Sequence, residues 1–208
     1  MRGVVALILR ARPAGSHVSG PGGHNLRVSI EPDTKDWTWV IDRACEACGF
    51  DPAEVTADGL VDLLHENTRG WYAVLADADA AVRPAPHVWS RLEYAAHVRD
   101  VHRLFAERVR LMLDQDDPEF ENWDQDATAV EEVYGEQDPA EVGTALVERA
   151  AEAAAVYAGV TDDQWQRTGR RSNGSAFTVE SIGRYHLHDV VHHLWDVSIT
   201  PGQPAVSD

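Results

Sequence analysis

From Asp36 onward, apolar residues recur every three or four positions over long stretches, which is the spacing of one face of an α-helix. Four stretches show this pattern, separated by polar or Pro- and Gly-rich connections, and strand-like alternation is scarce. They cover positions 56–80, 90–113, 138–159 and 178–198. The pattern predicts an all-α fold, a four-helix bundle, and the long link between the second and third helices permits a crossover connection.

Capping residues indicate where these helices begin. Ser90 followed by Glu93 is a capping-box pattern, and Thr178 is the expected cap of the last helix. Between the long helices, positions 126–134 are expected to form a short helix, and the arginine-containing segment 167–174 is expected to be a loop.

The two ends of the chain differ from the bundle. Residues 1–35 are rich in Gly, Pro and Ser and have no periodicity, so they predict a disordered tail. The expected bundle covers 36–200, and 201–208 form a C-terminal tail. The apolar run Val4–Leu9 is too short to span a membrane and makes a poor signal peptide, so a cytoplasmic location is expected.

The charge balance narrows the range of partners. Lys and Arg total 18 against 35 Asp and Glu, a formal net charge of −17. This excess of negative charge argues against nucleic acid and against docking on an anionic membrane, because both require cationic side chains. A small-molecule substrate is the expected partner, and a homodimer is also expected, because bundles with broad apolar faces often self-associate.

His97 is the first candidate for chemistry, because it lies on the apolar face of the second predicted helix. Tyr94 and Val101 are three and four residues away and share its side of the helix. A single core histidine is more often hydrogen-bonded to a neighbour than bound to a metal. His97 therefore needs partners before it indicates a site.

The last helix contains four histidines and two aspartates within a short segment. Residues at i and i+4 on a helix can face the same ion, and two such pairs occur on different faces: Asp189 with His193, and His188 with His192. We favour Asp189 and His193, because apolar residues continue their stripe in both directions. A solvated polar face without a metal is the alternative.

His97, Asp189 and His193 would supply three ligands from two helices. This would leave a coordination position open, as in catalytic rather than structural zinc sites. Asp196, one turn after His193, is expected to accept a hydrogen bond from an imidazole N–H and so orient a ligand.

This arrangement resembles the DinB-like superfamily. The resemblance is carried by a histidine on the second helix after a Trp-Ser-x-x-Glu start, and by a ligand-x-x-x-His pair on the last helix followed by Asp196. A carboxylate as the first member of that pair resembles the metal-binding domain of mycothiol-dependent maleylpyruvate isomerase. The similarity covers about 56–198. It implies a divalent metal, zinc or nickel, and in several members a low-molecular-weight thiol cosubstrate.

Two further features carry possible chemistry. Arg167, Arg170 and Arg171 form a local positive patch that could hold the carboxylates of a thiol cosubstrate, or could pair with surface acids. Cys45 and Cys48 could be half of a zinc site or a redox dithiol. We favour a bare structural or reducible cysteine pair, and a mixed site with a distant histidine such as His65 remains open.

Taken together, these features favour a metal-dependent transferase or isomerase that uses a low-molecular-weight thiol. One alternative is a non-catalytic helical binding or stress-response protein, whose metal is structural or absent. Another is a metal-assisted hydrolase, whose turnover needs no thiol. The sequence lacks the His-Glu-x-x-His, phosphate-loop, Gly-x-Ser-x-Gly and dinucleotide-binding motifs.

Overall fold

The computed structural model of the chain describes Ile30 and residues 35–198. The tails predicted over 1–35 and 201–208 therefore lie outside the described residues, apart from Ile30 and Lys35. None of the helices in the described part has an apolar stretch long enough to cross a lipid bilayer.

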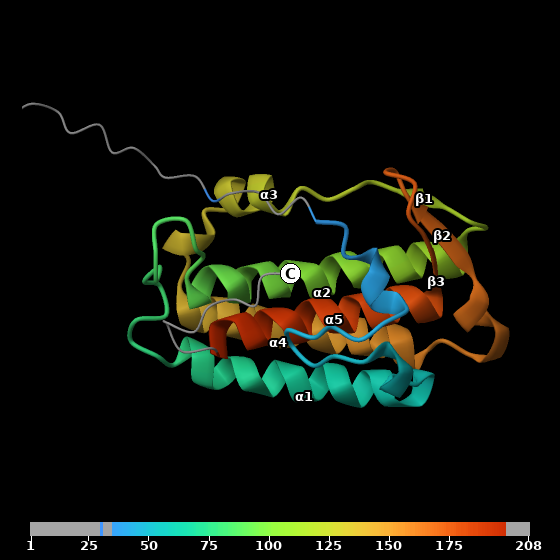
Figure 1. Cartoon of the computed structure of the whole chain (residues 1–208), viewed down its shortest axis with the longest axis horizontal. Helices are drawn as coiled ribbons and strands as arrows, with labels where there is room; N and C mark the ends of the chain where they lie inside the picture. The colour runs from blue at the N-terminus through green and yellow to red at the C-terminus, as the bar shows by residue number, and fades with distance from the viewer. Residues whose placement is uncertain (1–29, 31–34, 199–208) are drawn as a thin grey trace, which may run out of the picture.

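Four long helices dominate the structure (Figure 1), which confirms the predicted all-α four-helix bundle. The long helices are α1 (Ala57–Leu75), α2 (Arg91–Asp114), α4 (Pro139–Ala158) and α5 (Val179–Ser198). A short helix, α3 (Gln125–Glu131), lies between α2 and α4. Four 3-10 turns complete the helical content of residues 35–198: η1 (Thr38–Ile41), η2 (Pro52–Glu54), η3 (Tyr134–Glu136) and η4 (Asp162–Gln166).

The helix order in space is not the order along the chain. Helices α1 and α2 each pack against both α4 and α5, so α1 lies diagonally across the bundle from α2. The connection from α2 runs back along the length of the bundle, through α3, before α4 begins (Figure 1). Helices α2 and α4 therefore run in the same direction, which is the crossover that the long link permits.

Side-chain caps define the helix ends. Ser90 and Glu93 form the predicted capping box at the start of α2, and the Thr178 hydroxyl accepts a hydrogen bond from the Ser181 N–H at 3.0 Å in the first turn of α5. Helix α1 ends at Leu75 rather than near position 80. The chain turns there because the Asp77 side chain accepts from a backbone N–H two residues on, at 3.0 Å.

The segment predicted as a loop over 167–174 is instead part of a small sheet. Strands β2 (Thr168–Arg171) and β3 (Ala176–Thr178) form an antiparallel hairpin, and β1 (Glu119–Phe120) pairs with β2 in parallel. Gly174 has a φ of +95° in the hairpin turn, a conformation that favours glycine. The hairpin lies at one end of the bundle, immediately before α5.

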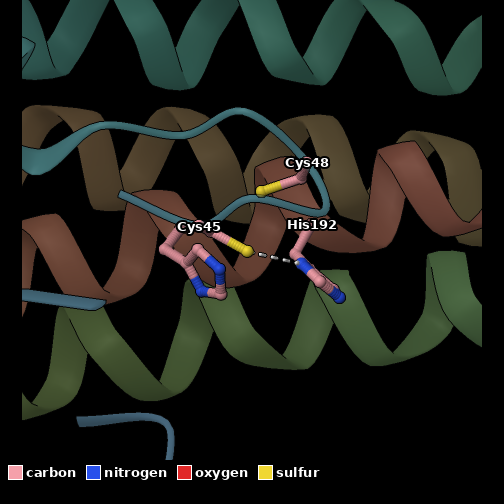
Figure 2. Close-up of side chains that lie close together, drawn as sticks. Cys45, Cys48 and His192 are labelled. Atoms are coloured by element: carbon pink, nitrogen blue, oxygen red, sulfur yellow. Dashed lines mark hydrogen bonds between the residues drawn. The ribbon is translucent and has the colours of Figure 1, made fainter. Parts of the chain in front are cut away.

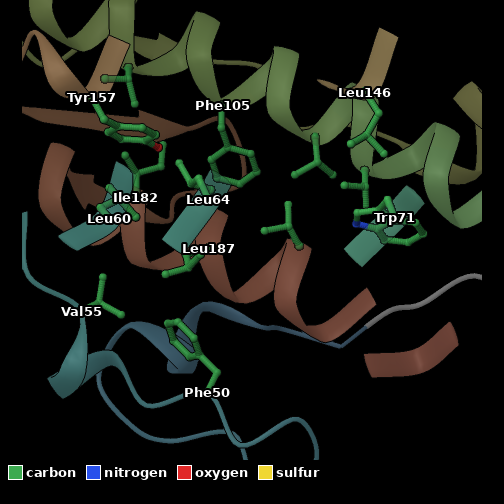
Figure 3. Close-up of a cluster of buried hydrophobic side chains, with 14 of the residues drawn as sticks. Phe50, Val55, Leu60, Leu64, Trp71, Phe105, Leu146, Tyr157, Ile182 and Leu187 are labelled. Atoms are coloured by element: carbon green, nitrogen blue, oxygen red, sulfur yellow. The ribbon is translucent and has the colours of Figure 1, made fainter. Parts of the chain in front are cut away.

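The main core fills the space between the four helices (Figure 3). Its large labelled members are Leu60, Leu64, Trp71, Phe105, Leu146, Tyr157, Ile182 and Leu187. Phe50 and Val55 of the N-terminal segment continue this core on the other side of α5. That segment, which includes η1, packs against α5 and is thereby brought close to the histidine-rich part of that helix.

Candidate metal centre

The histidine of α2 and the acid–histidine pair of α5 face a common point. One ligand atom from each of His97, Asp189 and His193 lies within 4.8 Å of the other two. Asp189 Oδ1 is 3.3 Å from His193 Nε2 and 3.6 Å from His97 Nε2, and the two imidazole rings are nearly perpendicular. The structure therefore brings together the three side chains that helical spacing selected.

This cluster contains polar atoms whose hydrogen-bonding capacity is unused. His97 is fully buried, and the Trp123 ring stacks on it at 5.2 Å with an interplanar angle of 4°. Within the described part of the chain, neither ring nitrogen of His97 nor Oδ1 of Asp189 has a hydrogen-bond partner. His97 Nε2 faces Asp189 Oδ1 at 3.6 Å, and because buried polar atoms are ordinarily paired, the lone pairs of these two atoms fit a cation held between them.

The protonation states of the cluster also suit a cation. Burial lowers the pKa of His97 by more than the nearby Asp189 carboxylate raises it, so the imidazole is neutral at pH 7. Burial alone would raise the pKa of Asp189, but the contact with the His97 ring and the field of His193 lower it below its ordinary value. Neutral imidazole and ionised carboxylate are the forms that bind a metal.

Asp196 is hydrogen-bonded to one of these imidazoles. Its Oδ2 accepts from His193 Nδ1 at 3.1 Å, and this hydrogen bond leaves Nε2 facing Asp189. Its other oxygen, Oδ1, lies 3.8 Å from Nε2 of His192. A carboxylate on the far nitrogen of a ligating histidine fixes both the tautomer and the ring orientation.

The cluster opens on one side to a cavity of about 800 Å³. Asp189 and His193 line this cavity, together with Tyr94, Trp123 and Arg171. His97 lies behind them in the core. The arrangement therefore combines a buried set of ligands with an accessible space large enough for small molecules.

The three arginines proposed for substrate binding have different surroundings. Arg167 donates to two carbonyl groups at the C-terminal end of α2, at 2.6 and 2.7 Å. Arg170 pairs at the surface with Asp117 at 2.7 Å. Arg171 alone of the three lines the cavity, and its guanidinium lies 5.5 Å from the centre of the Tyr185 ring. Successive residues of a strand point to opposite faces of the sheet, so Arg170 and Arg171 lie on different sides of β2.

The alternative ligand pair, His188 and His192, lies on a neighbouring face of α5. These histidines are grouped with Cys45 and Cys48, whose ligand atoms lie within 4.8 Å of theirs, whereas His65 is exposed and does not belong to the group. Burial raises the pKa of the Cys48 thiol to about 12, whereas reactive redox cysteines have lowered values. The prediction of a bare cysteine pair did not anticipate these histidines.

The contacts of two tryptophans and an arginine with the site were not predicted from the sequence. Trp89 and Trp123 both pack on the His97 ring, although they lie in connections rather than helices. Buried Arg108 donates to the carbonyl of Glu121 at 3.0 Å and so anchors the connection that carries Trp123. The available signal was that each tryptophan is a bulky aromatic residue in an otherwise polar connection.

A buried polar chain beside the core also escaped sequence reasoning. His186 Nε2 lies 3.0 Å from His102 Nδ1, and the Tyr157 hydroxyl lies 3.2 Å from His186 Nδ1. All three residues are buried between the helices. The positions of these residues on apolar helix faces indicated burial. The pairing of the two histidines could not be predicted, because they lie on different helices.

The fold and the site define a four-helix protein with a three-residue candidate metal centre that opens to a cavity. A family model of the DinB superfamily matches residues 60–197, and the chain belongs to this superfamily. This confirms the resemblance to the DinB-like superfamily found in the sequence.

Among solved structures, the chain is similar to YfiT from Bacillus subtilis, described as a probable metal-dependent hydrolase with an unusual four-helix bundle topology. The two share 20% sequence identity with a TM-score of 0.62, over 72% of this chain and 91% of that one. This likeness supports the fold. A search of curated proteins found no match.

Proposed function

We propose that the chain is a metal-dependent enzyme in which His97, Asp189 and His193 hold a divalent cation, zinc or nickel. The observation that carries the proposal is the pair of buried atoms His97 Nε2 and Asp189 Oδ1, which have no protein partners among the described residues, beside an 800 Å³ cavity that Asp189 and His193 line. Three protein ligands leave room for an exogenous one, which is the arrangement of a catalytic centre.

The favoured reaction is a transfer or isomerisation that uses a low-molecular-weight thiol of the mycothiol type. When bound, the metal supplies a Lewis acid that lowers the pKa of a thiol or water in contact with it. Asp196 keeps His193 in its ligating orientation. The rings of Trp89 and Trp123, which also line the cavity, pack on the imidazole of His97 and hold it in place.

Arg171 is the residue we assign to cosubstrate binding. It lies in the cavity wall, and its planar guanidinium can hold a carboxylate through two parallel hydrogen bonds. Arg167 and Arg170 are engaged with the α2 carbonyls and with Asp117, so the proposal does not include them.

A second candidate is a metal-assisted hydrolase, which the description of YfiT favours. The same centre would then activate water, and a thiol would be unnecessary for turnover. A non-catalytic role with a structural metal is less consistent with the geometry, because a structural site normally has a closed shell of four protein ligands.

Thiol binding to cobalt-loaded protein tests the proposal. Mycothiol, with glutathione as a second thiol, is titrated into the Co²⁺ form while the thiolate-to-cobalt charge-transfer absorption is followed as a difference spectrum. We expect a new band in the wild type and in Glu180→Gln, a change at the other end of α5 where Glu180 pairs with Arg184, and none in Asp189→Ala. A spectrum that neither thiol changes, together with thiol-independent ester cleavage, would favour the hydrolase instead.

A further inference from the structure

A second group of metal-ligand side chains lies on the neighbouring face of α5. We propose that Cys45, Cys48, His188 and His192 form a structural zinc site that fastens the N-terminal segment to this helix. The proposal does not depend on what the His97 centre catalyses.

The spacing of these atoms is that of ligands to one ion. Cys45 Sγ lies 3.7 Å from His192 Nδ1, and one ligand atom from each of the four residues lies within 4.8 Å of the others. Figure 2 shows the cysteine sulfur atoms of the loop beside His192 of α5. Zinc bonds of about 2.3 Å to sulfur and about 2.0 Å to nitrogen, at a tetrahedral angle, separate the two atoms by about 3.5 Å.

The backbone around the cysteines is folded to present both sulfur atoms on one side. The Cys45 N–H donates to the Phe50 carbonyl at 2.8 Å, and the Gly49 N–H donates to the Cys45 carbonyl at 2.9 Å. Gly49 has a φ of +76°, which few other residues adopt without strain. This tight Cys-x-x-Cys turn meets a His-x-x-x-His pair on a helix, and both spacings are common among zinc ligands.

The cluster is buried, and an unpaired polar atom in a buried position costs free energy. Cys45 is 2% exposed and His188 is 4% exposed, and the rings of Trp37 and Phe50 pack against His188 at 5.6 and 5.3 Å. The Nε2 atom of His188 is buried and has no hydrogen-bond partner in the part of the chain that the structure describes. A bound metal ion would give this buried, unpaired imidazole a partner.

The chemistry of the donors selects zinc and a structural role. Two sulfurs and two imidazoles in tetrahedral reach form a typical zinc set, and four protein ligands leave no position for a substrate. On binding, each thiol releases its proton. The two thiolates then neutralise the charge of the ion, which makes the site compatible with its apolar surroundings.

The fastened segment contributes to the cavity of the first centre. Asp36 and Trp37 line that cavity, and the Trp37 ring lies 5.1 Å from the His192 ring. Asp196 lies between the two centres, with one oxygen toward His193 and the other toward His192. Zinc at the cysteine site would therefore hold part of the wall of the catalytic cavity in place.

Metal analysis combined with zinc X-ray absorption tests the proposal. The protein is purified without a His tag, and His97→Ala is used to remove the first centre. We expect this variant to retain one zinc per chain, with two sulfur and two nitrogen ligands. Cys45→Ser/Cys48→Ser should lose one metal ion and the whole sulfur shell, whereas Glu46→Ala, an exposed change in the same turn, should lose neither.

The possible results distinguish failure of the cysteine site from failure of the centre formed by His97, Asp189 and His193. A zinc spectrum without sulfur ligands, or a Cys45–Cys48 disulfide in protein purified under reducing conditions, would overturn the proposal. If the double cysteine variant fails to fold, the absorption spectrum of His97→Ala still decides. One sulfur-bound zinc in both the wild type and His97→Ala would support the cysteine site while contradicting the proposed function of the first centre.

Discussion

Asp196 provides a sensitive test of the metal centre, because it should control metal affinity without touching the ion. Its Oδ2 accepts from His193 Nδ1 at 3.1 Å, while its Oδ1 lies 3.8 Å from His192 Nε2, beyond hydrogen-bond distance. Replacing Asp196 with Ala should therefore weaken metal binding at the centre formed by His97, Asp189 and His193, and should affect the cysteine site less.

The size of the effect follows from the geometry. Loss of a carboxylate that orients a ligating histidine typically costs 10- to 100-fold in metal affinity, or about 1.4–2.7 kcal/mol. The Asp196 side chain is 23% exposed, so water can replace part of the lost hydrogen bond, and we expect about tenfold for Asp196→Ala. Asp196→Asn retains an acceptor of about half the strength and should lose about threefold.

The assay is competition with a chromophoric chelator at fixed pH and ionic strength, on protein whose cysteine site is already loaded with zinc. Glu180→Gln is the matched control, because it removes a carboxylate from the same helix that pairs with Arg184 at 2.7 Å, far from the centre. Equal metal affinities for Asp196→Ala and Glu180→Gln would refute the orienting role.

Three further predictions concern stability and binding. Burial lowers the pKa of His102 to about 4, so the unfolded chain takes up a proton that the folded chain does not. In metal-free protein, His102 should therefore contribute about 2 kcal/mol to the loss of stability between pH 7 and pH 5, measured as the difference between the wild type and His102→Gln in urea unfolding, and an unchanged pH slope in His102→Gln would contradict this. Gly183→Ala should lower the free energy of unfolding by about 1–2 kcal/mol, because the added Cβ would lie 2.8 Å from the buried Leu60 side chain. Gly143→Ala should be neutral or slightly stabilising. Equal thermal midpoints for the two variants would count against this packing argument. Arg171→Gln should raise the KM for a carboxylate-bearing thiol about tenfold and Arg170→Gln should not, and the reverse result would remove Arg171 from the cavity model.

Most of the fold was predictable because its signals are local. Apolar spacing located the long helices, and the Ser90–Glu93 pattern located the start of α2 to the residue. The hairpin over 168–178 was missed, because its strands are short and β2 is stabilised by pairing with β1, about 50 positions earlier in the chain. Tertiary pairing of this kind leaves little trace in local periodicity.

In the candidate site, only the ligands that lie on the same helix could be paired from the sequence. The i, i+4 spacing and apolar stripe selected Asp189 and His193, and the structure places His97 beside them. The meeting of Cys45 with His192 could not be predicted, because it depends on how the N-terminal segment crosses α5. For the same reason, the packing of Trp123 on His97 depends on the path of the crossover connection.

Anomalous diffraction from crystals grown without added metal tests the central claim most directly, because it identifies both the position and the element. We expect a peak between His97, Asp189 and His193, at the absorption edge of zinc or nickel and next to the cavity. No anomalous peak at that position, in crystals where those three side chains are well ordered, would contradict the assignment of this cluster as the catalytic metal centre.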